Sequence, residues 1–288
     1  MHNILVTGAN GQLGSELQVL NDRFLMLDYK CFFTTKDELD ITNTFELERF
    51  VKQNFIKTII NCASYTAVDK AEKEKELCEL INHQAVKNLA LISKQNDISL
   101  IHISSDYVFD GESYKPYLES DKTDPINFYG LTKLKGEEAI KKIAPKNSAI
   151  IRTSWVYSKY GNNFVKTILK LASELQEIRV IFDQVGTPTY AKDLAKVILQ
   201  ICQKLNNKKP QIYHYSNEGV CSWYDFAHEI IKIKVYECKI LPIHTKEYPT
   251  LAKRPHISLL DKTKIKKDFG IEIPYWRDSL EKMLNERC

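Results

Sequence analysis

A serine, a tyrosine and a lysine in the middle of the sequence have the types and spacing needed for proton transfer. Ser105 follows an apolar, β-branched run at 98–103, which is typical of a buried strand. Tyr129 and Lys133 are four residues apart in a stretch typical of a helix, 129–142, so they lie on one face of it. A nearby ammonium lowers the pKa of a tyrosine from its usual ~10, and a serine hydroxyl can bind a substrate oxygen. The set predicts reduction of a carbonyl or oxidation of an alcohol.

The N-terminus carries a glycine-rich turn suited to a dinucleotide. An apolar strand expected at 3–6 leads into Gly8, Gly11 and Gly14, and a helix is expected at 15–20. Glycines allow a tight turn and a close approach of the backbone to a pyrophosphate, whose charge a helix N-terminus favours. No Gly-Lys-Ser/Thr follows, which excludes the phosphate loop of nucleotide triphosphatases. The pattern therefore predicts a dinucleotide site, and with it a source of hydride.

Composition is that of an ordinary globular protein. The residues are 43% hydrophobic and 27% charged, which is typical of a globular protein. A chain of 288 residues is long enough to form one large domain or two interleaved domains. No apolar run is long enough to span a bilayer, and we expect no signal peptide and no membrane partner. The seven cysteines are scattered without a C-x-x-C pair, which indicates reduced thiols in a cytoplasm and no zinc site. The net charge of +4 comes from dispersed lysines, so we expect no nucleic-acid partner.

Strand and helix signals alternate through the first half of the chain. Strands are expected at 3–6, 30–34, 57–61, 98–103 and 149–152, with helices at 15–20, 44–53, 74–95 and 129–142 between them. This alternation predicts an α/β fold with a Rossmann-type doubly wound parallel sheet. Beyond Trp155 we expect helices at 163–172, 191–205 and 222–233, a strand at 211–215 and a tail at 242–288 with two short helices. We therefore expect a dinucleotide-binding domain at 1–155, with a later return segment near 190–217. A smaller, irregular α/β substrate domain would take up mainly 156–288.

With these motifs in view, the chain resembles the extended short-chain dehydrogenase/reductases and, among them, the dTDP-4-dehydrorhamnose reductase family. The resemblance runs nearly end to end and is carried by the blocks 7–14, 39–41, 61–72, 104–109, 129–133, 152–157, 161–164, 183–189 and 254–256. Three of these blocks, Ala-Val-Asp-Lys-Ala-Glu at 67–72, Arg-Thr-Ser-Trp-Val-Tyr at 152–157 and Arg-Pro-His at 254–256, separate this family from sugar epimerases and dehydratases.

The resemblance implies NAD(P)H-dependent reduction of dTDP-4-dehydro-L-rhamnose to dTDP-L-rhamnose, the last step of activated rhamnose synthesis. Tyr129 would give its proton to the C4 oxygen, Lys133 would lower the pKa of Tyr129 and hold the nicotinamide ribose, and Ser105 would polarise the carbonyl. The residues implied to bind the cofactor are Gly8, Gly11, Gln12, Leu13, Gly14, Thr35, Asp40, Ile41, Cys62, Ala63, Ser64, Tyr129 and Lys133. Those implied to contact the nucleotide-sugar substrate are Ser105, Asp106, Trp155, Asn163 and Arg254, and no metal is implied at this site.

Other interpretations of these residues stay open on sequence alone. Trp155 could be simple core, Asn163 a helix cap and Arg254 a partner in a surface ion pair. The chain could instead reduce a related nucleotide 4-keto-6-deoxysugar. It also resembles the regulatory subunit of methionine adenosyltransferase, which binds a dinucleotide without turning it over. The second strand ends in Thr34, Thr35 and Lys36, which supply two hydroxyls and a cation. An acidic residue at this position would favour NADH, and none is present there. We therefore expect NADPH, with NADH as the alternative.

Some members of the resembled family are described as pairing through magnesium held by glutamates. The matching positions here are Glu16, Lys192 and Glu286. Hard divalent cations need several oxygen ligands, and a lysine ammonium among them repels the ion. We therefore expect a monomer, or a homodimer that is not bridged by a metal.

Overall fold

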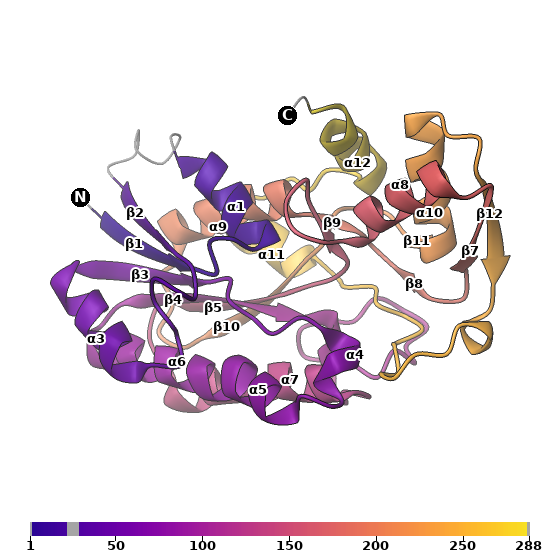
Figure 1. The fold of residues 1–288 in the computed structure, drawn as a ribbon. Helices are drawn as coiled ribbons and strands as arrows, with labels where there is room; N and C mark the ends of the chain where they lie inside the picture. Colours follow the sequence, from indigo (N-terminus) through magenta and orange to yellow (C-terminus); the bar gives the residue numbers. More distant parts are fainter. Residues whose placement is uncertain (1, 22–28, 287–288) are drawn as a thin grey trace.

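A six-stranded parallel sheet forms the centre of the computed structural model, which describes residues 2–21 and 29–286 (Figure 1). Its strands lie in the order β10-β5-β4-β3-β1-β2. Their bounds are β1 His2–Thr7, β2 Tyr29–Thr34, β3 Ile56–Asn61, β4 Ser99–Ser105, β5 Ser148–Thr153 and β10 Gln211–Tyr215. The strand order changes direction at the β1–β3 pair, and ligands bind at the carboxyl ends of strands at such a point. The predicted parallel α/β sheet is confirmed.

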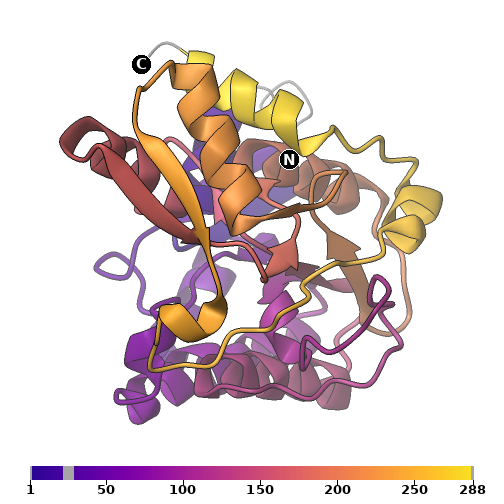
Figure 2. The ribbon, with the colours of Figure 1, turned by 90° about the vertical axis from the view of Figure 1, so that its right-hand side faces the viewer.

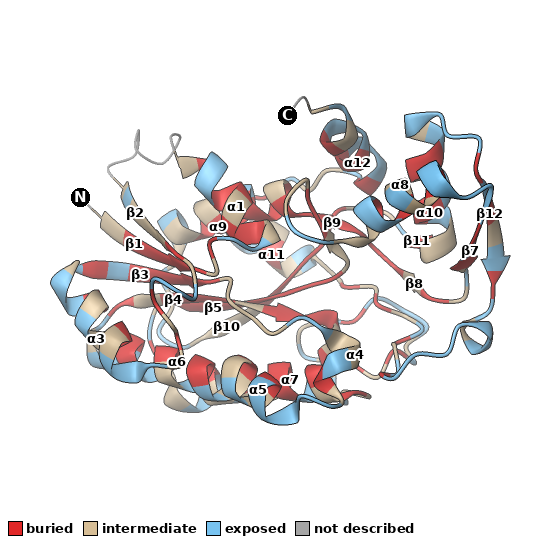
Figure 3. Cartoon of the chain, viewed as in Figure 1, coloured by how far each residue is buried: buried red, intermediate tan, exposed pale blue. Residues whose placement is uncertain are grey.

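Helices cover both faces of this sheet. On one face lie α1 (Gln12–Val19), α9 (Ala191–Lys204) and α11 (Thr263–Phe269), whose apolar side chains share a core with β1. On the other lie α3 (Thr44–Gln53), α6 (Ala85–Gln95) and α7 (Phe128–Ile143). Figure 3 shows the sheet and the inner sides of these helices buried, with the outer sides exposed. This arrangement confirms the doubly wound class.

Two helices differ from the sequence prediction. Helix α1 begins at Gln12, three residues before the expected start at 15, because Gly11 is extended (φ −77°, ψ 172°) and serves as the N-cap. The single helix expected at 74–95 is instead a series of segments. It comprises α5 (Lys75–Glu79), a π-helical turn at Leu80–Gln84, and α6, and a short α4 (Val68–Ala71) precedes it. The π turn buries Asn82, a residue whose contacts matter below.

The second half of the chain adds a small core of its own. Helices α8 (Phe164–Glu174), α10 (Trp223–Lys234) and α12 (Trp276–Asn285) pack around it with the parallel strands β7 (Glu177–Ile181) and β12 (Lys239–Ile243). Neither strand was predicted. Strand β12 contains Pro242, which argues against a strand in the middle of a sheet but is tolerated here because β12 has a single neighbour. The last two residues of the tail predicted at 242–288 lie outside the described residues.

Two short pairings join segments within the second half of the chain. Strand β6 (Val156–Tyr157) pairs with β9 (Thr189–Tyr190), and β8 (Val185–Gly186) pairs with β11 (Cys221–Ser222). The segment 245–262, called the strap below, begins with the 3-10 turn η3 (Thr245–Glu247). In Figure 2 the strap runs in orange and yellow from the second half across to the purple helices of the first. The chain thus returns to the central sheet at β10, and α9 and α11 pack on the same sheet, while the domain boundary at residue 155 stays a prediction.

Candidate active site

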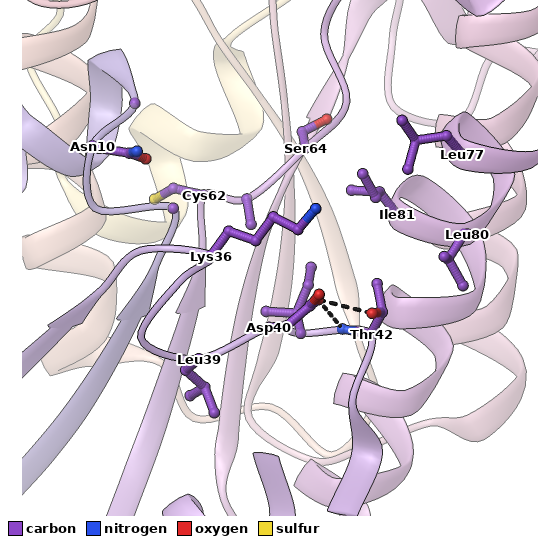
Figure 4. A pocket seen from close by; sticks show the side chains of 14 residues that line it. Asn10, Lys36, Leu39, Asp40, Thr42, Cys62, Ser64, Leu77, Leu80 and Ile81 are labelled. Carbon is purple, nitrogen blue, oxygen red and sulfur yellow. Dashed lines mark hydrogen bonds between the residues drawn. The ribbon is translucent and has the colours of Figure 1, made fainter. Parts of the chain in front are cut away.

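The first pocket, called the switch-point pocket here, opens at the carboxyl ends of β1 and β3 (Figure 4). It is lined by residues of the glycine turn, of the β3 end, of the loop after β2 and of the helix at 75–84. These are Gly8, Asn10, Gly11, Lys36, Leu39, Asp40, Ile41, Thr42, Cys62, Ala63, Ser64, Leu77, Leu80 and Ile81. The structure therefore brings together seven of the residues that the resemblance implied for the cofactor, from three separate strand ends.

The glycines of the turn are required by close backbone contacts. Gly8 has φ +68°, and a Cβ there would lie 2.7 Å from the backbone nitrogen of Ala63. A Cβ on Gly14 would lie 2.3 Å from the carbonyl oxygen of Gly8. Helix α1 has no acidic residue in its first turn, so its free N–H groups favour an anion. Gln12 and Leu13 stand in this turn, and both also line the neighbouring pocket. The cradle fits a pyrophosphate.

The far end of the switch-point pocket contains a cation that the sequence analysis did not assign to the site. Figure 4 shows the side chain of Lys36 extending into the pocket, with Leu77, Leu80 and Ile81 opposite. Asp40 accepts hydrogen bonds from the backbone N–H (2.9 Å) and the hydroxyl (2.8 Å) of Thr42. Thr35 does not line the pocket, because its N–H and hydroxyl donate to Glu38 at 2.8 and 2.9 Å. Lys36 is the group here that can meet an added phosphate.

A second, central pocket of about 520 Å³ adjoins the first and shares Gly11, Cys62 and Ser64 with it. Its wall contains all three predicted catalytic residues, from two elements: Ser105 at the end of β4, and Tyr129 and Lys133 on α7. The Nζ atom of Lys133 donates to the carbonyl oxygen of Ile103 at 2.7 Å and to Ser64 Oγ at 3.4 Å. Asn127 caps α7 by accepting from the N–H of Gly130, which fixes where the helix begins.

Burial dominates the electrostatics of this pocket. It raises the pKa of Tyr129, and the hydroxyls of Ser105 and Ser64 act against that rise. Burial also lowers the pKa of Lys133 to about 8, with Glu137 acting in the opposite direction. Burial of the phenol sets the direction of the Tyr129 pKa in this structure, so the lowering by Lys133 that the resemblance implied is not seen here. A phenol that stays protonated at neutral pH is suited to donate a proton.

Ser105 and Asp106 form a hydrogen-bonded pair beside Tyr129. The Ser105 hydroxyl donates to Asp106 Oδ1 at 2.8 Å and accepts from the N–H of Tyr107 at 3.2 Å. Asp106 Oδ2 is buried and makes no hydrogen bond of ordinary geometry among the described residues. Burial raises the pKa of Asp106 to about 6, and the hydroxyls of Ser105 and Ser258 act against that rise. Asp106 lines the central pocket, and a buried acceptor there is suited to a hydroxyl of a ligand.

Trp155 separates the central pocket from an outer groove. Its indole stacks on that of Trp223 with ring centroids 3.5 Å apart. Trp155 lines the central pocket, whereas Trp223 lines the groove between α8 and β7. The backbone of Trp155 is left-handed, with φ +49°, an uncommon conformation for a bulky residue. A Cβ on Gly186 would lie 2.8 Å from the indole. Trp155 is half-buried at a pocket wall and is not simple core.

Two residues implied to contact substrate lie outside the central pocket. Asn163 caps α8 by accepting from the N–H of Lys166 at 3.1 Å, and its amide donates to Gln12 Oε1 and to the carbonyl oxygen of Ser158. It does not line the central pocket or the outer groove. Arg254 lies in the strap, lines the outer groove and pairs with Asp69. The structure thus assigns Asn163 the role of a cap and places Arg254 outside the central pocket.

Sequence reasoning missed two buried groups behind the catalytic residues. Asn82, in the π turn, accepts from Ser64 Oγ (2.9 Å) and the N–H of Tyr65 (2.9 Å) and donates to Thr132 Oγ1 (3.3 Å). Glu137 is one turn beyond Lys133 on α7 and forms a buried ion pair with Arg152, with a shortest contact of 2.7 Å. Arg152 belongs to a block that the family resemblance had already singled out. Asn82 gave no comparable signal, because its burial depends on the π turn.

The three positions compared with a magnesium site do come together. Lys192 Nζ lies 2.5 Å from Glu286 Oε1, and Lys159 lies 3.7 Å from Glu286 Oε2. Glu16 is buried and accepts from the Ser158 hydroxyl at 2.6 Å. Within residues 2–21 and 29–286, no cluster of three or more His, Cys, Asp or Glu side chains could hold a metal ion. In the same ranges, no helix has the length and apolarity to cross a membrane.

Comparison with known proteins places the chain in a family. The family model described as RmlD substrate binding domain matches residues 1–288. The chain is 42% identical to the spore coat polysaccharide biosynthesis protein SpsK of Bacillus subtilis, covering 100% of this chain and 98% of SpsK. It is 42% identical to the dTDP-4-dehydrorhamnose reductase of Aggregatibacter actinomycetemcomitans, covering 98% of each. The crystal structure of the Bacillus anthracis dTDP-4-dehydrorhamnose reductase with NADP superposes with a TM-score of 0.93 at 38% identity, over 99% of each chain. The chain therefore belongs to the dTDP-4-dehydrorhamnose reductase family of extended short-chain dehydrogenase/reductases.

Proposed function

We propose that this protein reduces dTDP-4-dehydro-L-rhamnose to dTDP-L-rhamnose with NADPH. The observation that carries the proposal is the meeting of Ser105, Tyr129 and Lys133 on one wall of the central pocket, beside the glycine turn. The reduced nicotinamide, when bound, supplies the hydride to C4 of the sugar. Tyr129 delivers the proton to the C4 oxygen, so that the carbonyl gains one hydride and one proton and becomes an alcohol.

The other pocket residues prepare this transfer. Ser105 donates to the C4 oxygen once its hydroxyl turns away from Asp106, and Asp106 Oδ2 accepts from a sugar hydroxyl. Lys133 holds the nicotinamide ribose and stabilises the phenolate that remains after proton transfer. Trp155 packs against the deoxysugar, and the outer groove holds the nucleoside diphosphate. Arg254 and Arg179, which both line that groove, supply the positive charge for the phosphates.

The switch-point pocket would hold the cofactor. The N–H groups at the start of α1 would hold the pyrophosphate, and the apolar side chains of Leu39, Ile41 and Leu80 would hold the adenine. Lys36 stands where a 2′-phosphate would lie, at the end of the second strand. This position supports NADPH as the preferred cofactor, with NADH as a slower alternative.

The assembly and the location belong to the same proposal. The Lys192–Glu286 pair supports a monomer or a homodimer without a bridging metal. The six cysteines within the described residues are unpaired, which fits a reducing compartment such as the cytoplasm. The boundary between a dinucleotide-binding part and a substrate-binding part near residue 155 also belongs to the proposal.

A coupled assay tests the proposed reaction. The 4-keto sugar nucleotide is generated enzymatically from dTDP-glucose, the loss of NADPH absorbance is followed, and the product is identified by nuclear magnetic resonance. We expect NADPH oxidation that depends on the keto sugar, and dTDP-L-rhamnose as product. A product that is epimeric at C4 would indicate a related 4-keto-6-deoxysugar reductase. Tight NADPH binding without oxidation at any substrate concentration would indicate a dinucleotide-binding regulatory subunit.

A further inference from the structure

One carboxylate connects the α4 segment to the strap. Asp69, in α4, forms a two-point ion pair with Arg254: Nη2 lies 2.5 Å from Oδ2 and Nη1 lies 3.2 Å from Oδ1. The same Oδ1 accepts from the backbone N–H of Ala252 at 3.1 Å. Asp69 therefore binds both the side chain of Arg254 and the backbone two residues before it. Two segments that are 185 residues apart in sequence are held in register.

The contacts leave one edge of the guanidinium free. Arginine carries five N–H donors in a planar fork. Three contacts are made, two to Asp69 and one from Nη1 to the carbonyl oxygen of Ala252 at 3.2 Å. Nε–H and the second N–H of Nη2 have no partner among the described residues, and they lie along the same side of the fork. That side is the edge which binds a phosphate through two parallel hydrogen bonds.

Arg254 lines the outer groove together with Arg179 and Trp223, and it also lines a pocket beside the strap with Lys253 and His256. The hydrogen bonds from Arg254 hold the pKa of Asp69 below its usual value, so the carboxylate is charged at neutral pH. The Asp69 and Arg254 side chains are 39% and 23% exposed. An exposed ion pair of this kind adds little to stability. Its two-point geometry instead fixes the direction in which the rest of the fork points.

Resting on the proposed function, we propose that Asp69 is a positioning residue that aims the free edge of Arg254 at the diphosphate of the nucleotide-sugar. The carboxylate acts in two ways that oppose each other. It holds the guanidinium of Arg254 in one orientation, which favours diphosphate binding. Its negative charge also repels the phosphates on the other side of the guanidinium, which opposes binding. Changing its position while keeping its charge separates the two effects.

Asp69→Glu is the decisive variant, because it keeps the charge and moves the carboxylate by one methylene. Binding of dTDP and of thymidine is measured by calorimetry on the full-length protein saturated with NADPH. We expect Asp69→Glu to weaken dTDP binding about tenfold, the size of one charge-assisted hydrogen bond, and to leave thymidine binding unchanged. The KM for the keto sugar nucleotide should rise by a similar factor, with kcat and the KM for NADPH unchanged. Arg254→Lys should weaken dTDP binding by the same factor. The double variant Arg254→Lys/Asp69→Glu should bind dTDP no more weakly than Arg254→Lys alone.

Glu74→Gln is the matched control, because it removes an acid from the same part of the chain. The Glu74 carboxylate accepts from the Tyr65 hydroxyl at 2.8 Å, and Glu74 is not among the residues that Arg254 contacts. We expect this control to bind dTDP like the unmodified protein. Unchanged dTDP affinity in Asp69→Glu would overturn the inference, and so would an equal loss for thymidine. Tighter dTDP binding in Asp69→Asn would also overturn it, because repulsion would then be the main effect of Asp69. If the unmodified protein did not prefer dTDP to thymidine, the proposed function would fall as well.

Discussion

Lys133 donates a 2.7 Å hydrogen bond to the carbonyl oxygen of Ile103, on the strand next to its own helix. This bond holds a fully buried ammonium at the wall of the central pocket, where burial lowers its pKa to about 8. The bond and the nearby Glu137 carboxylate compensate for part of the lost hydration. The ammonium is kept at the catalytic site at a cost to the stability of the fold.

The first prediction measures that cost. The folded pKa of Lys133, about 8, lies below its unfolded value of 10.5, so the unfolded chain binds the extra proton between these two pH values. Below pH 8 the destabilisation is complete, and it fades as pH rises toward 10.5. Lys133→Met should therefore raise the unfolding free energy by on the order of a few kcal/mol at pH 7 and by much less at pH 10. Denaturant titrations of the cofactor-free protein at the two pH values check this. An equal or reversed effect at pH 7 and pH 10 would contradict it.

The second prediction concerns the proton donor. Tyr129→Phe should lower kcat about 100-fold or more, because a positioned general acid contributes that much. NADPH binding should be retained, since the phenol ring stays in place against Tyr107, whose ring centroid is 5.6 Å away. Stopped-flow turnover and fluorescence titration of NADPH measure the two effects. Near-normal turnover would assign the proton to another group.

Cofactor choice provides the third prediction. Lys36→Ala should lower kcat/KM for NADPH about tenfold and leave the value for NADH nearly unchanged, because only NADPH carries the added phosphate. Lys52→Ala serves as the control, since Lys52 pairs with Glu48 on the exposed side of α3. Equal losses with both cofactors would mean that Lys36 acts on a group they share. A preference of the unmodified protein for NADH would contradict the NADPH assignment itself.

The fourth prediction concerns chelation. Burial raises the pKa of Glu286, but hydrogen bonding and charge from Lys192 outweigh it and hold the pKa below its usual value. A carboxylate already paired with an ammonium is a poor ligand for magnesium. EDTA should therefore change neither the activity nor the mass found by light scattering. Lys192→Glu is the informative variant, since it restores an acid at this position. Inactivation of the unmodified protein by EDTA, reversed by magnesium, would show that the lysine is tolerated in a metal site.

A fifth prediction tests the wall made by the two tryptophans. Gly186→Ala should push the indole of Trp155 from its place, because the added methyl would lie 2.8 Å from the ring. We expect the KM for the sugar nucleotide to rise about tenfold, which corresponds to a loss of about 1.4 kcal/mol at a packed contact. The fluorescence spectrum of the stacked pair should shift as well. An unchanged KM together with a shifted spectrum would show that Trp155 moves freely without harm to substrate binding.

The parts of the site that sequence predicted are those set by local chemistry. Gly8, Gly11 and Gly14 are recognisable because the turn itself demands glycine, and Tyr129 and Lys133 because a helix fixes their spacing. Lys36 was named in the choice between NADPH and NADH but not among the residues implied to bind the cofactor, because its reach into the pocket depends on where a loop carries a long side chain. Asn163 was assigned to substrate by resemblance, yet its own sequence context, just before an amphipathic helix, already favoured a cap.

The parts of the fold that sequence predicted are likewise those set by local patterns. Each strand of the central sheet is a short apolar run between helices, and this alternation needs no distant partner to be recognised. Strands β7 and β12 depend on each other across 57 intervening residues, and Pro242 obscures the second of them. The π turn at Leu80–Gln84 is a local change of register inside an otherwise regular amphipathic stretch, which periodicity alone does not reveal.

The return of β10 to the sheet has a consequence for how the protein is made. All six residues of β5 are buried, and their outer neighbour is β10, which is synthesised 57 residues later. During translation, the chain between these points presents a bare apolar strand edge, the kind that pairs with other chains. Fragments that end between residues 154 and 210 should therefore aggregate, whereas those that reach beyond 215 gain the strand that closes this edge.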